Sequence, residues 1–173
     1  SILGQGGCVD SFGVGERLIT AKSEPVFGAV YKISAVEEKP GEFVPRIKIS
    51  ENVEKITNPG RKKVYRIIDE EGRAIADMIA KADEVVYMSL PFRYVDPTKP
   101  WKNRYFENCR AIELQKQIIR NGELVYDMPT LDEIAAYVKR QLSEEIWEEE
   151  QRFEYPHLHY LDMTPDYYEM KMQ

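Results

Sequence analysis

The most regular pattern of apolar positions in the chain lies between Thr130 and Ile146. Apolar residues recur there at three- and four-residue spacing, which is typical of an amphipathic helix. They are Leu131, Ile134, Ala135, Val138, Leu142 and Ile146. Thr130 and Glu133 match a capping box, in which a hydroxyl and a carboxylate satisfy backbone amides at a helix start. The pattern predicts a helix from this cap to about Arg152, ended by Pro156.

Three earlier segments have the β-branched and aromatic character of strands. They are residues 29–36, 43–49 and 63–68. The turn sequences Pro40-Gly41 and Asn58-Pro59-Gly60 separate them. The polar run at residues 69–72 predicts a hairpin from the third strand onto residues 74–80.

Residues 112–127 predict a second hairpin around Asn121-Gly122, because both turn positions tolerate positive φ. Proline and aromatic residues punctuate residues 91–101, which we interpret as an irregular packed connector. The sequence contains no internal repeat.

Composition places the chain among globular proteins. Of its 173 residues, 43% are hydrophobic and 31% charged, which excludes disordered and collagen-like chains and predicts about one domain, alone or with an appendage. No stretch approaches the roughly 18 apolar residues of a membrane helix. Cys8 and Cys109 form no disulfide framework, so we expect a reducing, cytoplasmic setting. The chain begins at Ser1 rather than Met, so we expect processing or a longer parent protein.

Charge is unevenly distributed along the chain. The net charge of −6 argues against general nucleic-acid binding. Residues 46–66 carry seven basic and two acidic side chains, whereas residues 132–154 carry eight acidic and three basic ones. We interpret the acidic run as the solvated face of a helix. The basic run is compatible with plain solubility or with a small anionic ligand.

Gly13-Val14-Gly15 follows a short, mostly apolar run at residues 8–12. Two glycines so placed let backbone N–H groups approach a phosphate closely. The dinucleotide fingerprint is not met, because Leu18 stands where its third glycine belongs. These residues alone leave a tight turn and a phosphate loop both open.

Lys32, Lys48 and Lys55 are flanked by apolar residues on or near the predicted strands. Such lysines can direct ammonium groups into a shared cleft and bind phosphate as point charges. They can equally occupy the solvent-facing positions of alternating strands.

His157 and His159 are the chain's two histidines, and their spacing suggests a metal site. No further His or Cys is near enough in sequence to complete one, so we interpret the pair as anchoring the tail and expect no metal site. Cys8 and Cys109 lack a neighbouring base and are interpreted as buried small hydrophobes rather than nucleophiles.

Three longer motifs together resemble the nicotinate phosphoribosyltransferase family. They are residues 10–20 (Asp-Ser-Phe-Gly-Val-Gly-Glu-Arg-Leu-Ile-Thr), residues 25–33 (Pro-Val-Phe-Gly-Ala-Val-Tyr-Lys-Ile) and residues 47–60 (Ile-Lys-Ile-Ser-Glu-Asn-Val-Glu-Lys-Ile-Thr-Asn-Pro-Gly). Later stretches at residues 112–114, 121–122, 129–137 and 153–161 resemble the C-terminal portion of the bacterial enzymes. The order of these motifs extends the resemblance along essentially the whole chain.

The resemblance implies an α/β fold. Residues 1–36 would be the end of an irregular α/β phosphoribosyltransferase barrel that carries the phosphate loop. Residues 37–128 would form a β-rich segment with hairpins, and residues 129–173 a C-terminal amphipathic helix and tail. The implied enzyme joins nicotinate to 5-phosphoribosyl 1-pyrophosphate, giving nicotinate mononucleotide and pyrophosphate in NAD salvage. ATP and Mg²⁺ are the implied cofactors.

The resemblance also assigns site residues. Backbone amides of Gly13, Val14 and Gly15 would cradle the ribose 5-phosphate. Lys32, Lys48 and Lys55 would lie near the phosphates and stabilise the leaving pyrophosphate, some of them in a neighbouring subunit's site.

The family's phosphorylated histidine and its nicotinate-ring contacts lie upstream of this sequence, so no catalytic residue is expected in the chain. The implied partners are the missing N-terminal part, in cis or as a separate chain, and a second copy in a homodimer. Neither nucleic acid nor a membrane is expected as a partner.

Two positions depart from the family pattern. Ala29 stands where many members have Gly, and Glu16 places a negative charge beside the loop. The alternatives are a catalytically silent binding or assembly module of the same ancestry, and nicotinamide or quinolinate specificity. A segment cut from its barrel should also leave apolar faces uncovered.

Overall fold

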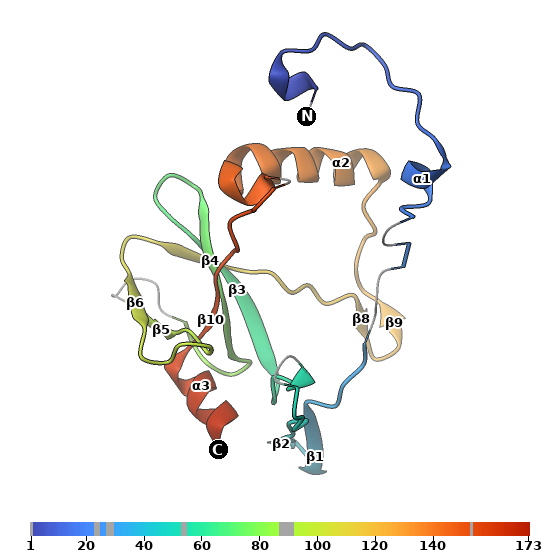
Figure 1. Ribbon diagram of the computed structural model, residues 1–173. Helices are drawn as coiled ribbons and strands as arrows, with labels where there is room; N and C mark the ends of the chain where they lie inside the picture. Colours follow the sequence, from blue (N-terminus) through green and yellow to red (C-terminus); the bar gives the residue numbers. More distant parts are fainter. Residues whose placement is uncertain (1, 23–24, 27–29, 53–54, 87–91, 153) are drawn as a thin grey trace. The chain divides into compact units, whose positions relative to one another are not determined.

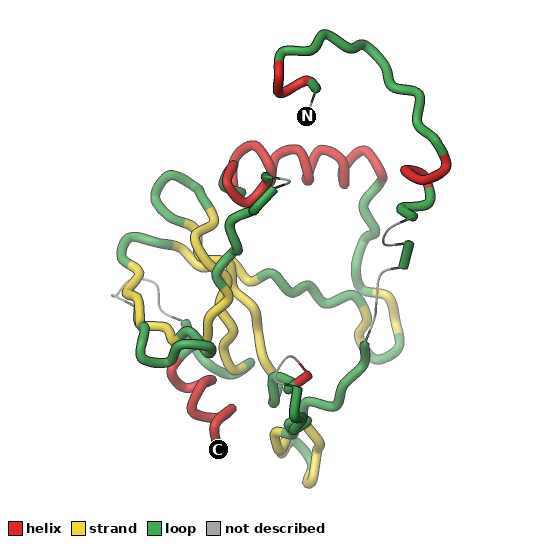
Figure 2. Tube along the Cα trace, viewed as in Figure 1, coloured by secondary structure: helices red, strands yellow, loops and turns green. Residues whose placement is uncertain are grey.

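The computed structural model describes residues 2–22, 25–26, 30–52, 55–86, 92–152 and 154–173 (Figure 1). The chain divides into two compact units, Ser1–Lys32 and Ile33–Gln173. The described part of the first unit holds a 3-10 turn, η1 (Leu3–Gln5), and one short helix, α1 (Glu16–Ile19). Its other described residues are loop or turn, so the barrel strand expected before the phosphate loop stays a prediction (Figure 2).

The second unit is built on a mixed six-stranded sheet with the strand order β6-β5-β10-β4-β3-β7. Its strands are β3 (Lys62–Ile68), β4 (Ala74–Lys81), β5 (Phe92–Val95), β6 (Asn103–Phe106), β7 (Arg110–Glu113) and β10 (Leu161–Met163). Neighbours pair antiparallel except β10 and β4, which are parallel. Two smaller sheets pair β1 (Ala35–Lys39) with β2 (Glu42–Pro45) and β8 (Ile119–Arg120) with β9 (Glu123–Leu124).

Both predicted hairpins form where local turn chemistry specifies them. Between β3 and β4, the Asp69 carboxylate accepts the backbone N–H groups of Glu71 and Arg73. Between β8 and β9, Asn121 and Gly122 adopt φ of 50° and 84°. The second hairpin is shorter than predicted, because residues 110–113 instead pair with β3 as β7.

The first two predicted strands are also shorter than predicted. β1 begins only at residue 35 and β2 ends at Pro45, so Lys32 and Lys48 lie outside the strands. Beyond the last pair, the Ser34 carbonyl still accepts N–H groups from Arg46 at 2.8 Å and Gly60 at 2.6 Å. Among the described residues no third strand joins this hairpin, and an alternating pattern without a pairing partner stays irregular.

The connector predicted for residues 91–101 is partly wrong, because residues 92–95 form β5. This segment gains a ladder on both sides, from β6 and from β10. β5 contains no proline, so the strand forms between the prolines of the segment at an interior position of the sheet.

Helix α2 (Leu131–Arg140) begins with the predicted capping box at Thr130. The prediction that it continues to Arg152 is wrong. One wide π turn, η3 (Gln141–Glu145), follows it, and a short 3-10 turn, η4 (Glu148–Gln151), comes after extended residues. The Trp147 indole N–H donates to the carbonyl of Ala74 at 2.9 Å, so contacts with the sheet replace the next helical turn.

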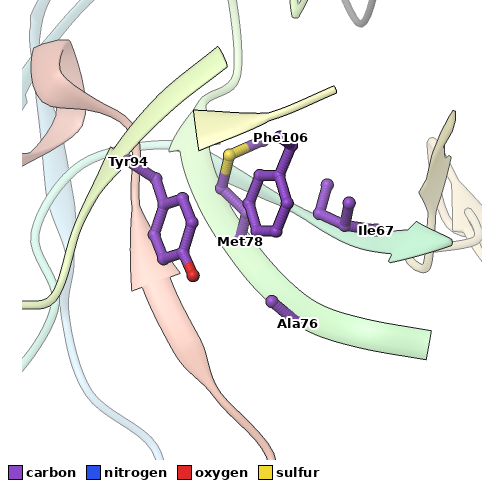
Figure 3. Close-up of a cluster of buried hydrophobic side chains, with 5 residues drawn as sticks. All are labelled: Ile67, Ala76, Met78, Tyr94 and Phe106. Carbon is purple, nitrogen blue, oxygen red and sulfur yellow. The ribbon is translucent and has the colours of Figure 1, made fainter. Parts of the chain in front are cut away.

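The core of the second unit is formed by side chains from the strands of the six-stranded sheet. Figure 3 shows five of its buried side chains: Ile67, Ala76, Met78, Tyr94 and Phe106. The last two stack with ring centroids 4.5 Å apart. A second cluster joins Ile79 and Met163 to Tyr167 of the terminal helix α3 (Pro165–Met172).

Helix α2, by contrast, has no buried residue. Leu131, at the start of its apolar stripe, is 80% exposed, and Ile134, Val138 and Leu142 are exposed as well. The stripe predicted from the sequence therefore exists but is not covered by described residues of its own unit, Ile33–Gln173.

Candidate functional site

Gly13, Val14 and Gly15 form an exposed loop that runs directly into α1. Gly15 is the residue before the helix, with an extended backbone at φ −93° and ψ 173°, and it has no side chain to cap the helix. Its carbonyl accepts the N–H of Leu18 at 3.1 Å. The first N–H groups of the helix thus receive no cap from Gly15, as a phosphate-binding loop requires.

The two loop glycines are not required by the backbone or by packing within the described chain. Neither Gly13 nor Gly15 has a positive φ, and a Cβ added at either would meet no described atom within 4 Å. Gly60 is the opposite case, because it has φ +76° and its added Cβ would lie 2.9 Å from Met170 Cε. Gly13 and Gly15 instead leave open space that a group outside this chain can approach closely.

The three candidate lysines are all exposed. Lys48 and Lys55 lie in one loop of the second unit, where the Lys48 N–H donates to the Thr57 hydroxyl at 2.9 Å. The Lys55 N–H donates to the carbonyl of Asn52 at 3.0 Å. Lys32 and the glycine loop belong to the first unit, so of the candidate residues only Lys48 and Lys55 share a unit and a loop.

Some positions of the resembling motifs have no structural account. Gly28 and Ala29 of the second motif and residues 53–54 of the third lie outside the described residues, as does Phe153. Glu16, whose charge departs from the family pattern, is the exposed first residue of α1.

Directly after the lysine loop, Asn58, Pro59 and Gly60 form a turn whose carbonyls all accept side-chain donors. The Lys62 ammonium donates to the carbonyls of Asn58 at 2.9 Å and Gly60 at 3.2 Å. The Tyr167 hydroxyl donates to the Pro59 carbonyl at 2.6 Å. Sequence reasoning missed this site, because Tyr167 stands 108 residues away from its acceptor.

His159 anchors the tail, as its interpretation from the sequence predicted. Its Nδ1 lies 3.0 Å from a Glu150 carboxylate oxygen and its Nε2 lies 3.4 Å from Asp77 Oδ1. Contact with Asp77 and then with Glu150 raises the pKa of His159, although burial opposes the shift. Arg66 binds both oxygens of Asp77, at 2.9 and 3.0 Å. His157 is exposed and takes no part in these contacts.

Asp162 on β10 is a second group that sequence reasoning missed. It is only 4% exposed, and burial, followed by the negative charge of Asp96, raises its pKa to about 6. It lines a small cavity of about 90 Å³ together with Tyr94 and Arg104. The Tyr94 hydroxyl is buried and has no hydrogen-bond partner among the described residues.

The cysteines differ from their interpretation in one respect. Cys8 is exposed, so its prediction as a buried hydrophobe is wrong; the described loop around it packs little against it. Cys109 is half-buried, and burial, with the charges of Asp69 and Glu70, raises the pKa of its thiol, which disfavours the nucleophilic thiolate.

The described residues present no group of three or more His, Cys, Asp or Glu side chains that could hold a metal ion. Within the same part of the chain, every helix is too short or too polar to cross a membrane.

A family model for the nicotinate phosphoribosyltransferase C-terminal domain matches residues 61–171. The chain belongs to this family. The family resemblance predicted from the sequence is thereby confirmed.

Several relatives are named nicotinate phosphoribosyltransferase. The Bacillus subtilis (strain 168) relative is 41% identical over 170 residues, which cover 98% of this chain and 34% of the relative. The Caenorhabditis elegans relative is 32% identical over 160 residues, covering 91% of this chain and 26% of the relative. The chain thus spans about a third of the Bacillus relative's length.

A crystal structure of human nicotinic acid phosphoribosyltransferase resembles this one with a TM-score of 0.59. The match covers 64% of this chain and 22% of the human chain, at 23% sequence identity. It shows a shared fold for that part of the chain, a mixed sheet with few helices.

Proposed function

We propose that this chain is the C-terminal part of an enzyme that joins nicotinate to 5-phosphoribosyl 1-pyrophosphate. The products are nicotinate mononucleotide and pyrophosphate, ATP hydrolysis drives the reaction, and the enzyme serves NAD salvage in the cytoplasm. The observation that supports this proposal is the 41% identity to the Bacillus relative over 98% of the chain. That alignment includes the glycine loop and the lysine loop as well as the family-matched residues 61–171.

The chain's contribution would be phosphate binding. Gly13, Val14 and Gly15 would offer backbone N–H groups to the ribose 5-phosphate, which can approach them closely because neither glycine has a side chain. Lys32, Lys48 and Lys55 would offset the charge that develops on the departing pyrophosphate.

We assign no proton transfer to this chain. His159 is held between two carboxylates, and the family's catalytic histidine belongs to the remainder of the enzyme. The described residues do not present a carboxylate cluster fitted to Mg²⁺.

The remainder of the enzyme, in cis or as a separate chain, is the proposed partner. The uncovered stripe of α2, from Leu131 to Leu142, supports this, because a row of apolar side chains in water favours burial against a second surface. A homodimer in which lysines reach the neighbouring site is proposed for the complete enzyme.

The test is product formation with and without that remainder. The chain is assayed alone and together with the other two thirds of the enzyme, and nicotinate mononucleotide is quantified by chromatography. We expect product only from the combination. A stable complex that forms no product would favour the silent assembly module, and faster turnover of nicotinamide would change the assigned substrate.

A variant pair tests the assigned phosphate contacts. Lys48→Ala should raise the KM for 5-phosphoribosyl 1-pyrophosphate by about tenfold, as expected for a lost charge-assisted contact. Lys116→Ala, a change at an exposed lysine of another loop, is the matched control and should leave this KM unchanged. Equal KM values in the two variants would remove Lys48 from the site.

A further inference from the structure

The contacts of the turn at residues 58–60 link the terminal helix α3 to the loop that carries Lys48 and Lys55. We propose that Tyr167 and Lys171 are positioning residues that hold this loop and thereby set the affinity for the phosphate-bearing substrate. The proposal rests on the phosphate-binding role proposed above for the two loop lysines.

Helix α3 is itself fixed to the sheet. The Thr164 N–H donates to the carbonyl of Ile79 at 2.9 Å, which continues the parallel β10–β4 pairing into the helix cap. The Thr164 hydroxyl then donates to Glu84 at 2.8 Å and accepts the Tyr167 N–H at 3.1 Å. Tyr167 is fully buried against Ile79 and Met163, so the position of its hydroxyl is fixed.

The turn receives two contacts from this helix through side chains. The Tyr167 hydroxyl donates to the Pro59 carbonyl at 2.6 Å, and the Lys171 ammonium donates to the Asn58 side-chain oxygen at 2.8 Å. Met170, between them, lies so close to Gly60 that a Cβ there would be 2.9 Å from its Cε. One face of the helix therefore contacts all three residues of the turn.

Two kinds of lysine can be separated in this region. Lys62 and Lys171 are partly buried and donate to the turn, and burial lowers the pKa of both. Lys48 and Lys55 are exposed, and none of the ion pairs among the described residues includes them. The first pair supports the turn, and the second remains available to an anion.

The turn continues directly into the lysine loop. Thr57 precedes Asn58, and its hydroxyl accepts the N–H of Lys48, while Lys55 stands two residues earlier. If the turn lost its contacts with α3, the ammonium groups of Lys48 and Lys55 would sample a wider range of positions. A cation that is held in place loses less conformational freedom when it binds phosphate, so a looser loop should bind more weakly.

The experiment compares Tyr167→Phe, which removes only the hydroxyl, with Tyr168→Phe on the same helix. Tyr168 packs against the same buried cluster, which makes it a matched control. Amide hydrogen exchange at Lys48 and Gly60 in Tyr167→Phe should become about fivefold faster, as expected for one lost hydrogen bond. In the active enzyme the KM for 5-phosphoribosyl 1-pyrophosphate should rise about fivefold with kcat unchanged. Tyr168→Phe should change neither value.

A second variant and a combined variant keep the proposal falsifiable. Lys171→Met keeps the apolar stem, should increase exchange at the same amides, and replaces Tyr167→Phe if that protein does not fold. In a Lys48→Ala and Lys55→Ala background, Tyr167→Phe should raise the KM no further, because positioning acts only through those lysines. An additional rise there would indicate a general structural defect and would overturn the proposal.

The positioning role of Tyr167 and the phosphate-binding role of Lys48 can be refuted separately. If Lys48→Ala raises the KM but Tyr167→Phe does not, the positioning role is wrong while the phosphate contact stands. If neither variant changes the KM while exchange still accelerates in Tyr167→Phe, the phosphate role proposed for the loop is wrong, and the positioning proposal falls with it.

Discussion

Asp162→Asn should stabilise the protein at neutral pH. Asp162 is 4% exposed on β10, and its pKa is raised from 3.8 to about 6 by burial and by the negative charge of Asp96. The folded protein therefore prefers the neutral carboxyl, whereas the unfolded chain ionises freely. Asn keeps the shape of this neutral group and needs no proton.

The size of the effect follows from the pKa difference. A shift from 3.8 to about 6 corresponds to about 3 kcal/mol, at roughly 1.4 kcal/mol for each pKa unit. Because the folded pKa of Asp162 is raised, its contribution is fully favourable below the unfolded pKa and is lost as the pH rises through about 6. Above that pH the whole difference should favour Asn.

Urea unfolding of both proteins at several pH values measures this directly. The difference in unfolding free energy should be small near pH 4 and grow to about 3 kcal/mol by about pH 7. Asp166→Asn, at an exposed carboxylate in the first turn of α3 and four residues away, is the control and should show no such growth. A difference that stays constant with pH, or an Asn variant that is less stable at neutral pH, would refute the reasoning.

Three further changes have defined outcomes. Gly15→Val should abolish binding of 5-phosphoribosyl 1-pyrophosphate to the complete enzyme in calorimetry, because a side chain would fill the approach path; unchanged affinity would remove the loop from the site. His159→Gln should remove a contribution of about 1.5–3 kcal/mol that is fully present below about pH 6.5 and disappears as the pH rises through the raised pKa of His159. Parallel pH–stability curves for this variant and the unmodified protein would contradict that assignment. Ile67→Ala, at a fully buried core position, should cost about 2–5 kcal/mol in urea unfolding, and a loss of under about 1 kcal/mol would show that the core cluster repacks easily.

Features that depend on a few neighbouring residues could be predicted from the sequence. The capping box at Thr130 and the Asn121-Gly122 turn both form as predicted, because their hydrogen bonds and φ angles involve adjacent residues. The end of α2 could not be predicted, because Trp147 leaves the helical path to reach Ala74 across the fold. The spacing of apolar residues around α2 gives no information about a partner so distant in the sequence.

The residues of the candidate site also differ in whether neighbouring or distant parts of the sequence determine them. The glycine loop could be proposed from the sequence because its residues are contiguous and resemble a family motif. The lysines were assigned to strands because their neighbours alternate, but residues 30–34 and 46–49 do not join a strand ladder in the described part of the chain. The contacts of Tyr167 and Lys171 with the turn cross more than 100 residues, since their partners stand 108 and 113 residues away. The residue types alone give no signal for such pairings.

The place of β10 in the sheet has a consequence for how the protein is made. Among the described strands of this sheet β10 is synthesised after the others, yet it lies between β4 and β5 and joins them (Figure 1). Until Leu161–Met163 emerges, the nascent chain can form the β3–β4–β7 group and the β5–β6 pair only as separate pieces, each with an open edge. Open edges are templates for pairing with other chains, and distant pairings form slowly. The two pieces can therefore join into one sheet only after β10 has left the ribosome.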